Sequence, residues 1–76
     1  MSTFLPVIAQ FSSEGQIRPL LFTWKDGKRY RIDEILDIRP AASLKSGGSG
    51  IRYTCRVSRQ ILYLFLDDNQ WFYELP

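Results

Sequence analysis

The feature that most constrains the fold is a two-residue alternation of apolar and polar side chains in the second half of the chain. The apolar positions of this stretch are Ile51, Tyr53, Cys55 and Val57, and the polar ones are Arg52, Thr54 and Arg56. Because successive side chains of a β-strand point to opposite faces, the pattern predicts a strand with one buried and one solvated face. It places Cys55 in the core as a small hydrophobic residue.

A second alternating stretch contains a hairpin signal. Leu20, Phe22 and Trp24 alternate along one predicted strand, and an Asp-Gly pair at residues 26–27 separates it from a return strand over residues 29–32. A tight turn between two strands requires positive φ, which glycine adopts without steric cost. We therefore expect a β-hairpin centred on this pair.

The alternation loses its phase just beyond that hairpin. Leu36 and Ile38 continue the apolar phase of the preceding strand, which puts Glu34 on the apolar face and Ile35 on the opposite one. A bulge or sharp bend near residues 33–35 would restore the pattern, and small barrels turn their corners in this way. A single helical turn ending at Leu36 is the alternative.

Three further segments read as strands. They are residues 5–11, the continuously apolar residues 61–66, which suit a strand buried on both faces, and residues 71–73. Because proline cannot donate a ladder hydrogen bond, Pro6 and Pro19 are expected at edges, strand starts or bulges. Most aromatic rings are expected in the core, with Phe72 as the exception that points outward.

These elements predict one all-β domain over residues 1–76. A chain of this size buries only about 60% of its unfolded surface, and its 45% hydrophobic and 14% aromatic residues supply the apolar area that this requires. With no helix available to cover the sheet, the sheet must curl over itself. We expect a small curled antiparallel sheet or an SH3-like open barrel of five to six short strands.

A long glycine-rich loop over residues 39–50 interrupts this pattern, and the basic residues gather around it. Between Ile38 and Leu66 the chain has five basic residues and no acidic one. Glycine-rich loops expose backbone N–H groups that can form anion sites, and arginines present N–H donors to phosphate or carboxylate groups. The candidate ligand-binding residues are Arg39, Lys45, Gly47, Gly48, Gly50, Arg52 and Arg56. The alternative is a flexible connector followed by a solvated strand face.

The composition excludes much catalytic chemistry. The chain has no histidine, which removes histidine-based acid–base catalysis, Ser-His and Cys-His nucleophile pairs and most zinc sites. Its single cysteine cannot form an intramolecular disulfide, and no apolar run approaches the about 20 residues of a membrane span. We expect a cytoplasmic protein that is not an enzyme, with no cofactor, no metal and no membrane partner.

Residues 22–37 resemble a run, F-x-W-x-G-x-x-Y-x-V-x-E-V-L, found in small uncharacterised bacterial domains. Those domains also carry an arginine–tyrosine strand, like Arg52 and Tyr53, and end in a tryptophan strand, like residues 71–73. The resemblance implies a bacterial domain of unknown function. Some of those domains accompany DNA-repair polymerases, which favours a nucleic-acid ligand. The glycine-rich segment is longer here than in that run.

Two functional hypotheses follow. The first is a binding module for a polyanion, either nucleic acid or a phosphorylated ligand, that uses the glycine-rich loop and the arginine face of the following strand. The second is a module for protein–protein interaction or self-association into a homodimer, because small sheets with exposed edges pair readily.

Overall fold

A computed structural model describes residues 4–40 and 50–76. These residues form two antiparallel sheets, with strand orders β1-β2-β3 and β4-β5-β6-β7. The strands are β1 (Val7–Phe11), β2 (Ile17–Thr23), β3 (Arg29–Arg31), β4 (Glu34–Pro40), β5 (Ile51–Val57), β6 (Gln60–Asp67) and β7 (Gln70–Glu74). The all-β prediction is confirmed. Over these residues the sheets do not close into a barrel, and no helix is present that is long and apolar enough to cross a membrane.

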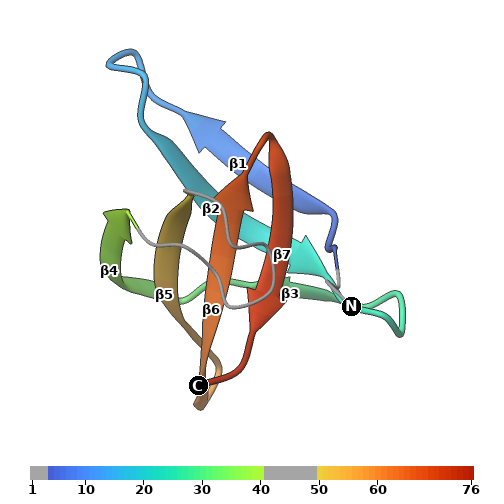
Figure 1. The fold of residues 1–76 in the computed structure, drawn as a ribbon. Coiled ribbons are helices and arrows are strands. Elements are labelled where there is room, and N and C mark those ends of the chain that lie inside the picture. Colours follow the sequence, from blue (N-terminus) through green and yellow to red (C-terminus); the bar gives the residue numbers. More distant parts are fainter. Residues whose placement is uncertain (1–3, 41–49) are drawn as a thin grey trace.

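The strand count exceeds the predicted five to six because one alternating run is divided by a corner. The chain leaves the three-stranded sheet after Arg31, passes through Ile32 and Asp33, and enters the four-stranded sheet at Glu34. The corner is fixed by a backbone hydrogen bond of 2.9 Å from the Asp33 N–H to the Arg56 carbonyl. Figure 1 shows the result, in which β1, β2 and β3 lie across one face of the other sheet.

The core fills the space between the two sheets. Its buried side chains come from both sheets and from the N-terminal segment: Leu5, Phe22, Tyr53, Cys55, Val57, Leu62 and Leu64. The alternation predicted for β5 is confirmed, since Tyr53 is 2% and Cys55 0% exposed. The Tyr53 hydroxyl donates a hydrogen bond to the Ile17 carbonyl on β2. A buried tyrosine hydroxyl requires such a partner, and this one ties the two sheets together.

The prediction of which β4 side chains face the core is wrong, because this strand contains a bulge. The pairing with β5 shifts between Ile35 and Asp37, so that Leu36 is the extra residue. Ile35 therefore packs against the core, whereas Leu36 and Ile38 are 48% and 45% exposed. The expectation of a bend or bulge in this region is confirmed, and the alternative helical turn is not formed.

A second bulge breaks the alternation predicted along β2. Ile8 pairs with Leu21 and Ala9 with Pro19, which leaves Leu20 without a partner residue on β1 and 44% exposed. Pro19 is buried in its place. A bulge is one of the few sites where a strand tolerates proline, so the expectation for Pro19 is confirmed.

The Asp-Gly hairpin is confirmed. Gly27 has φ of +82°, and its N–H donates to the Trp24 carbonyl at 2.9 Å. The turn joins β2 to β3, which pair from Thr23 and Arg29 onward.

Phe72 lies on the opposite face from its neighbours, as predicted, but it is buried rather than exposed. Trp71 and Tyr73 pack against the core. Phe72, 3% exposed, stacks on Phe65 with ring centroids 5.3 Å apart and an interplanar angle of 5°. Phe4 meets it edge-on at 6.2 Å. Cross-strand aromatic pairs stabilise a sheet, so the outer face carries a small apolar layer of its own.

Cys55 is a core residue, as predicted. Burial raises the pKa of its thiol to about 12. Because the folded state holds this proton more tightly than the unfolded chain does, the thiol favours folding below pH about 9. That contribution is lost as the pH rises toward 12 and the unfolded thiol ionises.

We predict that Cys55 reacts with a disulfide reagent at pH 8 only when the chain unfolds. Because a stability of about 5 kcal/mol or more leaves few molecules open, labelling of the native protein is expected to be about 10³-fold slower than labelling in denaturant. Absorbance of the released thiolate measures both rates. A native rate close to that of glutathione would contradict the burial of the thiol.

Candidate functional site

The predicted ligand-binding residues divide into two groups. Lys45, Gly47 and Gly48 lie outside the described residues. The structure places the other four on or beside the β4–β5 pair: Arg39, Gly50, Arg52 and Arg56. Arg39 lies directly opposite Arg52, and Arg56 lies opposite Glu34. Arg39, Arg52 and Arg56 therefore share the outer face of one strand pair, as the alternation along β5 predicts for Arg52 and Arg56.

Two of these arginines have carboxylate partners. The Arg56 guanidinium donates to Glu34 across the strands at 2.8 Å, and the Nε of Arg39 donates to Asp37 at 2.6 Å. Each hydrogen-bonded carboxylate raises the pKa of its arginine. Both pairs are exposed, so water and salt screen them strongly. Part of the positive charge that the sequence concentrates after Ile38 is thus offset by acidic residues of β4.

Arg52 has a different environment. Its guanidinium carbon lies 4.8 Å from the centre of the Tyr63 ring on the neighbouring strand β6. Within the described residues Arg52 forms no ion pair, and its buried Nε has no hydrogen-bond partner. A guanidinium over an aromatic face is held by a cation–π interaction of about 0.5–1 kcal/mol. Within the part of the chain that the structure describes, Arg52 is therefore held on the sheet surface by an aromatic ring and not by a carboxylate.

Gly50 has a packing role. A Cβ at this position would lie 2.9 Å from the Leu66 carbonyl oxygen and 3.1 Å from the Asp67 Cβ. The chain therefore approaches β6 more closely than any other residue allows as it enters β5. This contact explains the glycine at position 50 without a ligand.

We predict that Gly50→Ala destabilises the domain by about 1–3 kcal/mol, the usual cost of overpacking. The clash is with backbone, so the start of β5 must shift away from β6. Urea denaturation followed by tryptophan fluorescence measures the change. An unchanged midpoint would show that the strands have room for a side chain.

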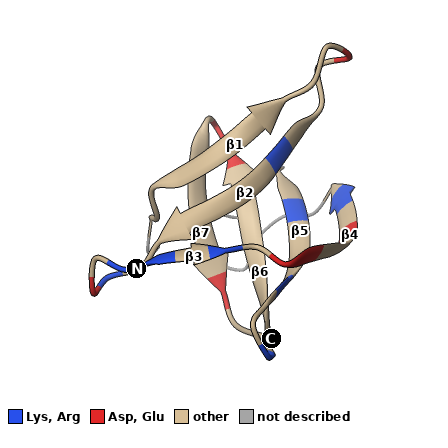
Figure 2. Ribbon diagram, turned by 180° about the vertical axis from the view of Figure 1, so that it is seen from behind, with Lys and Arg blue, Asp and Glu red and all other residues tan. Residues whose placement is uncertain are grey.

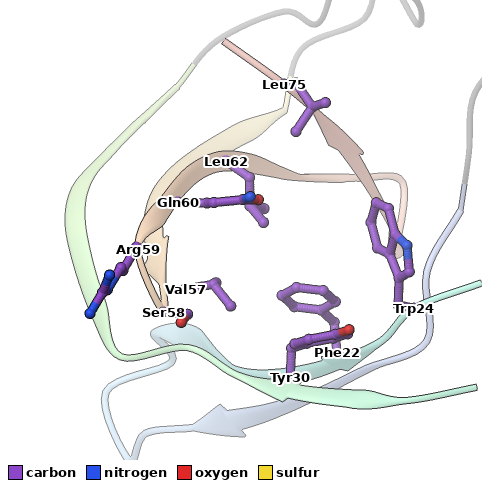
Figure 3. A pocket seen from close by; sticks show the side chains of 9 residues that line it. All are labelled: Phe22, Trp24, Tyr30, Val57, Ser58, Arg59, Gln60, Leu62 and Leu75. Atoms are coloured by element: carbon purple, nitrogen blue, oxygen red, sulfur yellow. The ribbon is translucent and has the colours of Figure 1, made fainter.

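A pocket that the sequence analysis missed lies at one end of the two sheets. It has a volume of about 420 Å³, within the range of about 300–1,000 Å³ typical of small-molecule sites. The β2–β3 hairpin provides Phe22, Trp24 and Tyr30, the β5–β6 turn provides Arg59, and the start of β6 provides Gln60. Figure 3 shows these side chains arranged around an open centre.

The aromatic wall of this pocket is built by contacts between its rings. Phe22 stacks on Tyr30 at 5.8 Å, and Trp24 meets Phe22 edge-on at 6.2 Å. On its other side Trp24 contacts Tyr73 at 4.6 Å, and the Lys25 ammonium lies 5.6 Å from the Trp24 ring centre. The alternation of β2 and β3 indicates apolar residues here. The alternation does not indicate that the β5–β6 turn lies opposite these apolar residues.

Lysines and arginines that form no ion pair within the described residues lie on both sheets and in the turns between strands. Figure 2 shows lysine and arginine on β2, β3 and β5, with acidic residues at the β3–β4 corner. Among the described residues only Arg39 and Arg56 form ion pairs. The basic residues without a described ion pair are Arg18, Lys25, Lys28, Arg29, Arg31, Arg52 and Arg59. The same residues contain no cluster of side chains suited to hold a metal ion.

Comparison with known proteins finds no matching family model, no matching curated protein and no matching solved structure. The site must therefore be interpreted from its own geometry.

Proposed function

We propose that this chain is a non-enzymatic module that binds single-stranded nucleic acid through the outer face of β5. The observation that carries the proposal is Arg52, held over the Tyr63 ring at 4.8 Å with no described carboxylate partner. A guanidinium stacked in this way keeps its outer N–H groups available for a phosphate, which it binds in a bidentate manner. The adjacent ring offers a surface on which a base can stack.

The neighbouring arginines extend this surface along the strand pair. Arg39 lies across from Arg52, and Arg56 lies four residues further along β5 on the same face. Their carboxylate partners are exposed, so an incoming phosphate can compete for the guanidinium groups. Release of counterions from the nucleic acid then supplies affinity without reading sequence.

The second candidate is a protein-interaction or self-associating module. Strand β1 is an edge strand, and its Ile8 and Phe11 are 48% and 72% exposed. An edge with exposed apolar side chains is a template for pairing with another chain. Light scattering over a range of concentrations separates the candidates, since a strict monomer that binds oligonucleotide supports the first and excludes the homodimer.

We predict that Arg52→Ala weakens binding of a short mixed-sequence single-stranded oligonucleotide about tenfold, the effect of losing one charge-assisted contact. Fluorescence anisotropy at several salt concentrations measures the affinity. Arg18→Ala is the matched control, because it removes from the other sheet a charge that likewise forms no ion pair within the described residues. Equal losses in both variants would indicate diffuse attraction and overturn the assignment to β5.

We also predict that Glu34→Gln tightens oligonucleotide binding. The substitution frees Arg56 from its ion pair, and one additional phosphate contact steepens the salt dependence by about 0.7 for a single strand. Glu14→Gln, in the β1–β2 turn, makes the same change in net charge away from this face. The same anisotropy titration shows the effect. If Glu14→Gln tightened binding as much, Arg56 would have no part in the contact.

A further inference from the structure

The pocket at the end of the sheets has an uneven distribution of polar groups. One side is the aromatic wall of Phe22, Trp24 and Tyr30. Opposite it, the Gln60 side chain is directed into the open centre, whereas Arg59 extends away from the interior (Figure 3). The pocket thus combines flat apolar surfaces, an amide inside and a cation at its edge.

The polar groups restrict what the pocket accommodates. Its described lining contains no aspartate or glutamate, so no carboxylate there pairs with a cationic ligand. An amide both donates and accepts hydrogen bonds, and an aliphatic side chain would leave that capacity unused. Flat rings with donors and acceptors on their edges use both features, because they stack on aromatic side chains and bond to the amide.

The position of the pocket connects it to the β5 face. Arg56 ends the arginine row on that face, and Arg59 follows three residues later in the tight turn between β5 and β6. Ser58, with φ of +58°, reverses the chain between them, and its N–H is held by the Asp33 carboxylate. A backbone of phosphates that follows β5 therefore meets a further cation at the edge of the pocket.

We propose that this pocket binds one nucleobase of the single strand. The base lies against Trp24 and Tyr30, Gln60 bonds to its edge, and Arg59 contacts the adjoining phosphate. This inference rests on the proposed function, to which it adds a defined base site.

The experiment uses the fluorescence of Trp24 in a Trp71→Phe background, which removes the other tryptophan of the chain. Four probes are titrated: a single-stranded oligonucleotide, an abasic oligonucleotide of equal length, a nucleoside monophosphate and ribose 5-phosphate. We expect the two base-containing probes to quench Trp24 and the two base-free probes to leave it unchanged. Near-UV circular dichroism verifies that the background variant keeps its packing.

A pair of glutamine variants tests the pocket without altering its aromatic wall. Gln60→Ala is expected to weaken binding of the monophosphate several-fold and to leave binding of the abasic oligonucleotide unchanged. Gln70→Ala is the matched control, because Gln70 is also exposed and also begins a strand after a tight turn. Gln70→Ala is expected to change neither the binding of the monophosphate nor that of the abasic oligonucleotide.

The outcomes separate this inference from the proposed function. If anisotropy showed oligonucleotide binding but Trp24 were not quenched, the proposal of a base site in the pocket would be overturned. The proposal that the outer face of β5 binds nucleic acid would still hold. Absence of oligonucleotide binding at low salt would overturn both. Equal quenching by ribose 5-phosphate would reduce the pocket to an anion site.

Discussion

The packing of the three-stranded sheet against β5 holds the rest of this structure in place. A short all-β chain without a helix must bury its main apolar layer with its own strands, and among the described residues that layer lies mostly between the two sheets. Tyr53 and Cys55 lie at its centre, and the Tyr53 hydroxyl bonds to the carbonyl of Ile17 on the opposing sheet. Asp33 fixes the corner between the sheets, because its N–H bonds to the end of β5 and its carboxylate accepts the N–H of Ser58.

Both candidate binding surfaces derive from this arrangement. The inward side chains of β5 build the core, so the alternate ones, including Arg52, must stand on the outer face. The turn that follows β5 is held beside the β3–β4 corner by Asp33. This places Arg59 and Gln60 opposite the rings of the β2–β3 hairpin. The β5–β6 hairpin thus presents arginines on the outer face of β5, and its turn closes an aromatic pocket.

The charge distribution shows why linear patterns mislead in an antiparallel sheet. Along the sequence, the segment between Asp37 and Asp67 contains five basic residues and no acidic one. In space, antiparallel pairing brings Glu34 to Arg56, twenty-two positions away. The positive charge of the basic stretch is therefore partly offset by acidic residues on the neighbouring strand β4. Among the described residues, Arg52 has the Tyr63 ring beside it and no ion pair with a carboxylate.

The sequence by itself determined the local features of this protein. The alternation around Cys55, the glycine turn after Trp24 and the bend beyond Arg31 follow from side-chain period and backbone sterics, which act between near neighbours. Only the tertiary structure decided which residues face one another. The bulge at Leu36 reverses the faces of β4, Phe65 buries Phe72, and the β5–β6 turn completes the pocket. These outcomes depend on strand register and on the packing of distant segments, which no local pattern encodes.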